Sequence, residues 1–236
     1  MPTAMILAAG RGERMRPLSD ACPKPLLQAG GKPLIVWQIE ALARAGYAEL
    51  VINVAHRADD FVDALGDGRA FGVRIRFSRE AAPLEAAGGI ATALPLLPAG
   101  PVLVVSGDVW TAYDYAGLNA RHGAMRQSPA APRAHLVMVP NPSYHPEGDF
   151  HLDGARLTLD GMPRLTFANI ALYDTALFAE LSRGVKLKML PLYQSWIRAG
   201  LVSGERYDGP WANVGTPADL AALDASLASR PAPPHP

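Results

Sequence analysis

Short apolar runs alternate with amphipathic segments of helix length along the first half of the chain. Runs of about four to eight mostly apolar residues are typical of strands buried on both faces of a parallel sheet. Such runs predict buried strands at Thr3–Ala8 and Pro101–Ser106, and we also expect strands at Glu49–Ala55 and Val73–Ser78. Apolar residues at helical spacing predict helices at Pro33–Ala45, Asp59–Leu65 and Gly89–Leu97, the last of which Pro95 ends early or kinks. Strands that alternate with helices favour right-handed βαβ crossovers and a parallel sheet.

The second half of the chain has a less regular pattern. Gly123–Ala134 has the composition of an exposed loop, and Arg230–Pro236 is a Pro-rich tail that we expect to be disordered. The remaining segments predict strands at His135–Val139 and Leu165–Tyr173, a hairpin of Asp149–Leu152 with Ala155–Leu159, and helices at Leu187–Ala199 and Pro217–Ser229, the last capped by Thr216. We therefore expect an α/β fold over residues 1–229. It is a Rossmann-like, mostly parallel open sheet with helices on both faces and a small second lobe.

Composition excludes several classes of protein. The chain has 236 residues, with 22 Lys and Arg against 22 Asp and Glu, so its charge gives no reason to expect nucleic acid or an anionic membrane as a partner. No apolar run approaches the ~20 residues of a membrane span, and no basic region precedes the first apolar run as in a secretory signal. Cys22 is the only cysteine, which excludes an internal disulfide and a cysteine-based zinc site. We expect a cytoplasmic globular protein.

The first candidate for chemistry is the loop that follows the first predicted strand. Leu7–Leu18 contains Gly10 and Gly12, which let the backbone approach a phosphate, and three arginines that add cationic donors. The spacing matches neither the dinucleotide-binding fingerprint nor the Walker motif. The structural alternative is a tight surface turn with solvated arginines.

Two further positions carry charge at defined places. Lys24 lies between Pro23 and Pro25, which hold the backbone extended and present the ammonium group from a stiff segment. Asp108 follows Pro101–Ser106, and ligands bind at the carboxyl ends of strands in open parallel sheets. Asp108 is therefore a candidate for a metal or a ribose hydroxyl. The alternatives are a surface lysine and an aspartate that caps a turn.

Together these motifs resemble the nucleotidyltransferases that make nucleoside-diphosphate sugars. That family opens with L-A-A-G-x-G-x-R-M and P-K-P, which Leu7–Met15 and Pro23–Pro25 match, and Gly107-Asp108 matches its G-D motif. Trp211–Thr216 resembles its C-terminal W-x-D-x-G-T, with Asn213 in place of Asp. The likeness covers residues 3 to about 228.

Within the family, four stretches resemble bacterial N-acetylmuramate-1-phosphate uridylyltransferases of peptidoglycan recycling. These are Pro83–Ile90, Gly107–Thr111, Asn141-Pro142 with Gly148–Phe150, and Val202–Glu205. The resemblance implies Mg²⁺-dependent transfer of UMP from UTP to a sugar 1-phosphate, with release of pyrophosphate. It also implies a nucleotide-binding part at about 1–110, a sugar-binding part at about 111–229, and a monomer or small homo-oligomer.

The resemblance also implies a role for each matching residue. Arg14, Lys24 and Asp108 are the implied catalytic residues, and Asp108 and Asn213 the implied Mg²⁺ ligands. The nucleotide would be bound by Lys24 together with Leu7, Ala8, Ala9, Gly10, Arg11, Gly12, Glu80, Pro83, Glu85 and Gly88, of which Glu80 would face the base. The sugar would be bound by Asn141, Asp149, Asn169 and Lys186. Asn169 stands where relatives often have Gly.

The implied chemistry needs no histidine, because a sugar phosphate is already an anionic nucleophile and requires no general base. We therefore interpret His56, His122, His135, His145 and His151 as structural or solvated. N-acetylmuramate carries a lactyl carboxylate that N-acetylglucosamine lacks. Candidates to bind this carboxylate are Arg164, Lys186 and Asn169.

Two alternatives remain open at this point. A guanylyltransferase making GDP-mannose or a GDP-heptose is the first, because a carboxylate at Glu80 suits the paired N–H donors of guanine better than the single N3–H of uracil. The second is a catalytically inactive regulatory homologue, for which Asn213 is the only support. The loop spacing disfavours a kinase or a dehydrogenase.

Overall fold

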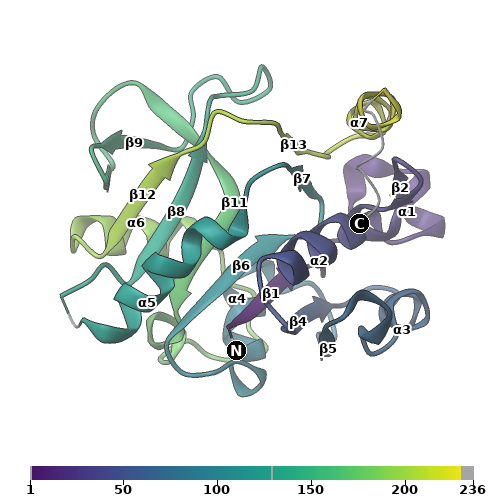
Figure 1. The fold of residues 1–236 in the computed structure, drawn as a ribbon, viewed down its shortest axis with the longest axis horizontal. Helices are drawn as coiled ribbons and strands as arrows, with labels where there is room; N and C mark the ends of the chain where they lie inside the picture. The colour runs from purple at the N-terminus through teal and green to yellow at the C-terminus, as the bar shows by residue number, and fades with distance from the viewer. Residues whose placement is uncertain (1, 129, 230–236) are drawn as a thin grey trace.

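The computed structural model describes residues 2–128 and 130–229. Its main feature is a sheet of nine strands that runs through both halves of the chain (Figure 1). In spatial order these are β5 (Arg74–Arg79), β4 (Glu49–Val54), β1 (Thr3–Leu7), β6 (Pro101–Ser106), β11 (Arg164–Asp174), β8 (Ala134–Val139), β12 (Val202–Arg206), β10 (Arg156–Thr158) and β9 (Phe150–Asp153).

The N-terminal four strands form the parallel part of the sheet. β4 pairs in parallel with β1 and β5, and β1 pairs in parallel with β6, so that Ile6 lies beside Ile52 and Val105. Both faces of β1, β4 and β6 are buried, which explains why each is a mostly apolar run. β5, at the edge of the sheet, instead alternates exposed arginines with more buried residues. The four predicted strands are confirmed to within one residue at each end.

The C-terminal strands make the sheet a mixed one. β11 is antiparallel to β6 and β8, whereas β12 is parallel to β8. β9 and β10 form the predicted antiparallel hairpin, in which Gly154 adopts φ +56°. The α/β class is confirmed, and the parallel arrangement holds for the N-terminal half and for β8 with β12.

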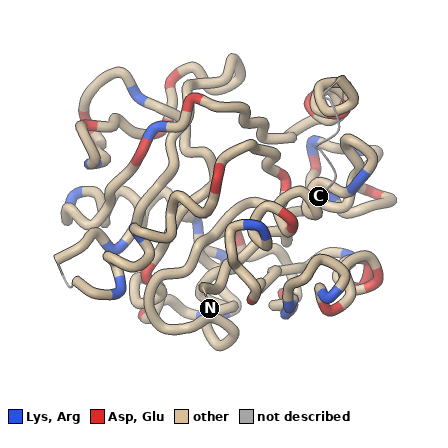
Figure 2. The backbone as a smooth tube through the Cα atoms, in the orientation of Figure 1, with Lys and Arg blue, Asp and Glu red and all other residues tan. Residues whose placement is uncertain are grey.

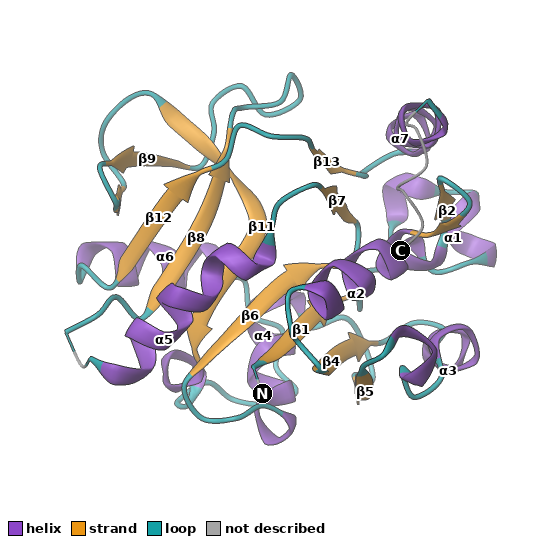
Figure 3. Cartoon of the chain, viewed as in Figure 1, coloured by secondary structure: helices purple, strands orange, loops and turns teal. Residues whose placement is uncertain are grey.

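Helices cover both faces of the sheet, as predicted (Figure 3). Ala4 and Ile6 of β1 pack on the side of α2 (Leu34–Arg44), α3 (Ala58–Leu65) and α5 (Asn119–Gln127). Met5 packs on the opposite side with α4 (Glu85–Ala93) and α6 (Leu190–Arg198). α7 (Pro217–Ala228) begins with the predicted Thr216 cap, and its Leu223 packs in a third cluster with Met15 and Leu34.

Two predicted segments differ from the structure. α4 begins at Glu85 rather than Gly89, so that Gly88 and Gly89 lie inside a helix, where glycine is ordinarily unfavourable. The predicted loop Gly123–Ala134 begins inside α5, which continues to Gln127. Only Met125 of this polar helix is buried, so its sequence shows no apolar period. The predicted disordered tail, residues 230–236, lies outside the described residues.

Short elements complete the fold around the parallel strands. β7 (Val109–Thr111) pairs with β13 (Trp211–Asn213), and β2 (Gln28–Ala29) pairs with β3 (Lys32–Pro33). After β1 the chain forms the 3₁₀ turn η1 (Glu13–Met15), the short helix α1 (Leu18–Ala21) and a second 3₁₀ turn, η2 (Lys24–Leu26), in that order. None of the helices in the described ranges is both long and apolar enough to cross a membrane.

Candidate functional site

Two cavities adjoin each other at the carboxyl ends of β1 and β6. The first cavity has a volume of about 940 Å³ and the second about 510 Å³. Leu7, Ala86 and Ser106 line both, so the two spaces share a wall. This is the edge where the sequence predicts ligand binding in an open α/β sheet.

The loop after β1 forms one wall of the first cavity. The Ser19 hydroxyl donates to the Gly12 carbonyl at 2.8 Å, and Gly12 adopts φ +63°, which favours glycine. A Cβ atom on Gly10 would contact nothing within 4 Å, whereas one on Gly12 would lie 3.0 Å from Lys24 Cβ. Every predicted member of this loop lines the cavity: Leu7, Ala8, Ala9, Gly10, Arg11, Gly12 and Arg14.

Asn53 fixes the start of this loop from the neighbouring strand. Its Oδ1 accepts from the Ala8 N–H at 2.9 Å, and its Nδ2 donates to Glu80 Oε1 at 2.7 Å. Glu80 Oε2 accepts from the Leu84 N–H at 3.1 Å. Asn53 lines the first cavity, although the sequence analysis did not single it out.

Glu80, predicted to face the base, lies behind the wall of the first cavity. Glu80 is 7% exposed and lines neither cavity, and both carboxylate oxygens already accept hydrogen bonds from Asn53 and Leu84. Burial raises the pKa of this carboxyl group, and the two hydrogen bonds oppose that rise. Glu80 therefore acts behind the cavity wall, where it positions Asn53 and the start of α4.

The start of α4 forms the opposite wall. Pro83 and Glu85 line the first cavity as predicted, and Glu85 adopts φ +62°. Gly88, predicted to contact the nucleotide, lines neither cavity. A Cβ atom there would lie 2.2 Å from the Val185 carbonyl oxygen, so Gly88 serves close packing.

Lys186, predicted on the sugar side, lines the first cavity instead. Its Nζ lies 3.6 Å from Glu85 Oε1, and both side chains are largely exposed. The position follows from backbone pairing between its segment and α4, because Leu187 donates its N–H to the Leu84 carbonyl at 2.9 Å and accepts from Gly88 N–H.

Lys24 and Asp108 meet at the boundary of the two cavities. Lys24 Nζ lies 2.6 Å from Asp108 Oδ2, and the lysine side chain is 10% exposed. The β7–β13 ribbon brings Asn213 opposite Val109, and the Val214 N–H donates to the Asp108 carbonyl at 3.0 Å. Asp108 lines the first cavity and Asn213 the second.

Arg14 approaches the same ribbon from the loop. A Cβ atom on Gly215 would lie 3.5 Å from both terminal guanidinium nitrogens of Arg14, so the arginine head group lies in van der Waals range of this turn. Asp219 Oδ2 accepts from the N–H groups of Gly215 and Thr216 at 3.0 and 2.8 Å, which fixes the turn beside Arg14. The structure thus brings Arg14, Lys24, Asp108 and Asn213 into one region.

The donors at this boundary suit a hard divalent cation. A carboxylate from Asp108 and an amide oxygen from Asn213 are oxygen ligands, and Mg²⁺ in proteins is often bound by one or two side chains together with waters and substrate phosphates. Within residues 2–128 and 130–229 no group of three or more His, Cys, Asp or Glu side chains could hold a metal ion. The residues therefore fit a Mg²⁺ ion completed by substrate oxygens.

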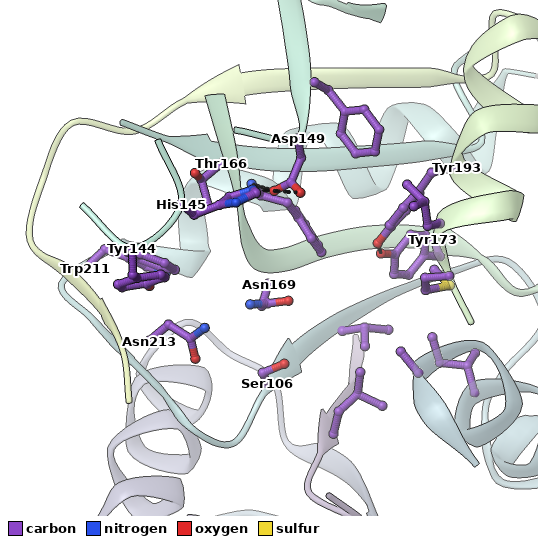
Figure 4. A pocket seen from close by; sticks show the side chains of 18 residues that line it. Ser106, Tyr144, His145, Asp149, Thr166, Asn169, Tyr173, Tyr193, Trp211 and Asn213 are labelled. Atoms are coloured by element: carbon purple, nitrogen blue, oxygen red, sulfur yellow. Dashed lines mark hydrogen bonds and ion pairs between the residues drawn. The ribbon is translucent and has the colours of Figure 1, made fainter. Parts of the chain in front are cut away.

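The second cavity has an apolar wall and a few polar groups (Figure 4). Asn169 lies within a bulge of β11, with φ +58°, and its side chain occupies the middle of the cavity in this view. Asp149 Oδ2 accepts from the Phe167 N–H at 2.8 Å, and Asp149 Oδ1 lies 3.2 Å from His145 Nε2. The apolar side of the cavity is lined by Ile90, Val104, Phe150, Phe167, Tyr173, Met189, Leu190 and Tyr193.

Asn141 does not line this cavity, contrary to its predicted contact with the sugar. Its amide donates to the carbonyls of Pro146 and Arg164 at 2.8 and 3.1 Å, and its Oδ1 accepts from Thr166 Oγ1 at 2.9 Å. These bonds hold the 141–149 loop against β11, and through this loop Asn141 positions Asp149 and its neighbours.

Tyr144 and Trp211 are cavity residues that the sequence analysis missed. Tyr144 is 57% exposed, and its side chain hydrogen-bonds that of Asn213. Partial burial and the Asp219 carboxylate raise the pKa of Tyr144, and the hydrogen bond to Asn213 opposes this rise. Trp211 Nε1 donates to the Ala168 carbonyl at 3.0 Å and so ties β13 to the bulge that carries Asn169. The only sequence signal for either residue was the position of Trp211 at the start of the C-terminal motif Trp211–Thr216.

The chain resembles known nucleotidyltransferases. The nucleotidyl transferase family model matches residues 3–142. An N-acetylmuramate alpha-1-phosphate uridylyltransferase of Neisseria meningitidis is 46% identical over 217 residues, which cover 90% of this chain and 93% of the relative. A mannose-1-phosphate guanyltransferase of Schizosaccharomyces pombe is 42% identical over 124 residues, which cover 51% of this chain and 34% of the relative.

Solved structures share the fold. A Bacillus anthracis protein provisionally assigned as a glucose-1-phosphate thymidylyltransferase superposes with a TM-score of 0.84 at 19% identity. The superposition covers 98% of this chain and 97% of that one. The two proteins therefore share one fold over nearly all of their aligned length.

Proposed function

Because this chain belongs to the nucleotidyl transferase family, we propose that it transfers UMP from UTP to N-acetylmuramic acid 1-phosphate, giving UDP-N-acetylmuramate and pyrophosphate. The observation that carries the proposal is the 46% identity to a uridylyltransferase of that specificity over 90% of this chain. The two adjoining cavities support it, because the reaction joins two separately bound substrates.

The first cavity suits the nucleoside triphosphate. Backbone N–H groups of the Gly10–Gly12 loop are free to approach phosphate oxygens closely, since no side chain covers Gly10. Arg14 neutralises charge on the departing pyrophosphate, and Lys24 neutralises charge on the α-phosphate. Because the charge on the leaving pyrophosphate develops only as the bond breaks, the Arg14 contact favours the transition state over bound UTP.

Mg²⁺ is the cofactor we propose for this site. Asp108 and Asn213 would hold it at the boundary of the cavities, where it would supply positive charge to the substrate phosphates. Lys24 holds one carboxylate oxygen of Asp108 in place, which leaves the other oxygen for the metal. The site thus combines a fixed carboxylate, a neutral amide oxygen and two cationic side chains.

The second cavity suits the sugar. Its apolar wall can pack against the sugar ring and an acetyl methyl group, while Asn169 offers an amide to polar substituents. The phosphate of the sugar would lie toward Asp108 and Asn213. Its oxygen attacks the α-phosphorus of UTP, the bond from that phosphorus to the β-phosphate bridging oxygen breaks, and pyrophosphate leaves. The attacking oxygen is already ionised, so the reaction needs alignment and charge neutralisation rather than a base.

The proposed substrates set the context of the reaction. UTP is made inside cells, and N-acetylmuramate comes from peptidoglycan, so the proposed place of the reaction is the cytoplasm during recycling of the cell wall. A guanylyltransferase remains the competing activity. It is less well supported, because the guanyltransferase relative matches only 51% of this chain, whereas the uridylyltransferase relative matches 90% of it.

The test incubates the purified protein with Mg²⁺ and each of the four nucleoside triphosphates against a set of sugar 1-phosphates, and measures pyrophosphate release. We expect UTP with N-acetylmuramic acid 1-phosphate to give the highest kcat/KM. A higher value for GTP with mannose 1-phosphate would overturn the proposal in favour of the guanylyltransferase.

A further inference from the structure

The second cavity contains a histidine–aspartate pair that the proposed chemistry leaves without a role. Of the residues that line it, only His145 and Asp149 carry side chains that can be charged near neutral pH, and no Lys or Arg from the described residues lines it. Figure 4 shows the two side chains directed at each other across the top of the cavity. N-acetylmuramate, if it is the substrate, brings a carboxylate into this space.

The cations expected from the sequence to meet that carboxylate are elsewhere. Arg164 lines neither cavity, and its Nη2 donates to the Leu159 carbonyl at 2.9 Å. Lys186 lines the first cavity, beside Glu85. His145 is therefore the basic side chain that the described structure offers to an anionic substituent of the sugar.

Both members of the pair are held in place by the backbone. The Phe167 N–H fixes Asp149 Oδ2, while His145 N–H donates to the Pro142 carbonyl at 2.9 Å and the His145 carbonyl accepts from Gly148 N–H at 3.3 Å. Asp149 Oδ1 then engages Nε2 of the imidazole at 3.2 Å. Among the described residues Nδ1 has no hydrogen-bond partner, which leaves one ring nitrogen for a ligand.

We propose that His145 recognises the lactyl carboxylate of the sugar, with Asp149 as its positioning residue. An imidazolium ion carries an N–H on both ring nitrogens, so it can donate to Asp149 through Nε2 and to the substrate carboxylate through Nδ1. Charge-assisted bonds of this kind are stronger than bonds between neutral groups. This inference rests on the proposed function and adds the residue that sets its sugar specificity.

Asn169 supplies a second donor to the same substituent. Its φ of +58° is a conformation that Asn tolerates better than most residues other than Gly, so the bulge can present an amide where a glycine would present none. The side chain lies below the His145–Asp149 pair in Figure 4 and has no hydrogen-bond partner among the described residues. The side-chain amide of Asn169 and the protonated imidazole of His145 can thus both donate to one carboxylate.

The test compares two substrates in the same enzyme preparation. For wild type and His145→Gln we would measure kcat/KM with N-acetylmuramic acid 1-phosphate and with N-acetylglucosamine 1-phosphate, which lacks the lactyl group. The ratio of the two values should fall about tenfold or more in the variant, because a charged donor to the carboxylate is lost. A ratio within about twofold of wild type would overturn the proposal.

The ratio is independent of how much of the variant folds, because both substrates meet the same molecules. His151→Gln is the matched control: its ring binds the Pro163 carbonyl outside the cavities, and its ratio should not change. Asp149→Asn should lower the ratio as well, by a smaller factor. If wild type uses UTP with neither sugar, the proposed function fails; if it uses both and only the ratio is insensitive to His145, this inference alone fails.

Discussion

The Lys24 ammonium group contacts the carboxylate that the proposed reaction needs as a metal ligand. A buried ammonium requires a counter-charge, and Asp108 Oδ2 supplies it at 2.6 Å. The pair consequently fixes the carboxylate in one orientation before any substrate binds. Preorganised charge of this kind is worth more than charge that must reorient during the reaction.

Asp108→Asn tests this residue directly. The amide removes the one full negative charge that we assign to Mg²⁺ and leaves Lys24 without its partner, so kcat should fall about 100-fold or more. The measurement is pyrophosphate release at saturating UTP, sugar phosphate and Mg²⁺. Asp63→Asn, an exposed helix position, is the control and should retain wild-type kcat. Near-normal turnover of Asp108→Asn at saturating Mg²⁺ would remove Asp108 from the mechanism.

Asn213 gives a graded test of the same site. Asn213→Ala loses an oxygen ligand, so its rate should fall about tenfold or more and recover in part with excess Mg²⁺. Asn213→Asp should need less Mg²⁺ than wild type, because a carboxylate binds a hard dication more strongly than an amide does. The measurement is the Mg²⁺ concentration that gives half-maximal rate. Equal midpoints in wild type and both variants would mean that Asn213 is not a ligand.

At the residue scale, the sequence predicts the side chains whose signals are local. The conformations of Gly10, Gly12 and the Pro-flanked Lys24 are set by residues only a few positions away in the sequence. All three line the first cavity. The roles of Glu80 and Gly88 depend on partners far along the chain: Asn53 for Glu80 and the Val185 carbonyl for Gly88. No local pattern reports such contacts, so residue spacing alone could not separate them from ligand-binding residues.

At the scale of elements, a strand that is buried on both faces can be predicted from its apolar run. A helix whose sequence is set by close contacts with distant residues cannot. β6 has its predicted bounds because its sequence is an apolar run that ends at Ser106. The predicted start of α4 is too late, because Gly88 and Gly89 lie inside the helix. Glycine is needed there since a Cβ atom would collide with the Val185 carbonyl at Gly88 and with the Asn53 side chain at Gly89. α5 was missed because Met125 is its only buried residue.

A buried histidine links two strands of the C-terminal half. His135 of β8 is fully buried; its Nδ1 lies 2.9 Å from Ser203 Oγ and its Nε2 lies 3.2 Å from Glu205 Oε2, both on β12. Burial lowers the pKa of His135, and the bond to Glu205 opposes that effect. The folded protein therefore holds this imidazole neutral at a pH where an unfolded chain would begin to protonate it.

This difference predicts a pH dependence of stability. As pH falls below the ordinary histidine pKa of 6.5, the unfolded chain takes up a proton that the folded chain resists, so the stability that neutral His135 contributes is lost in that window. Melting temperature should fall between about pH 7.5 and about pH 5.5, and His135→Gln should show a smaller fall despite a lower melting temperature at the upper pH.

The control for this prediction is His151→Gln, which changes a histidine whose ring binds only the Pro163 carbonyl. It should retain the wild-type pH dependence. A fall in melting temperature as large in His135→Gln as in wild type would assign the acid sensitivity to other groups. Measurements stay above the ordinary carboxyl pKa of 4.5, because hydrogen bonds from His135 and Tyr113 lower the pKa of Glu205 and add a separate loss at lower pH.

At the scale of the whole molecule, one continuous sheet carries both cavities. The parallel strands end at the first cavity, and β11 with its Asn169 bulge forms part of the second. Figure 2 shows basic and acidic residues spread along the chain in that view, in keeping with equal numbers of each. Attraction of two polyanionic substrates therefore depends on local groups, above all Arg14 and Lys24.

The central claim is that the two cavities hold UTP and a sugar phosphate on either side of Asp108, so that the bond between the α-phosphorus and the β-phosphate breaks. The most direct measurement follows the label from UTP carrying ³²P at the α or the γ position, with N-acetylmuramic acid 1-phosphate and Mg²⁺. We predict that α-label appears in the UDP-sugar and γ-label only in pyrophosphate. Transfer of γ-label to the sugar, or its release as inorganic phosphate, would contradict the account.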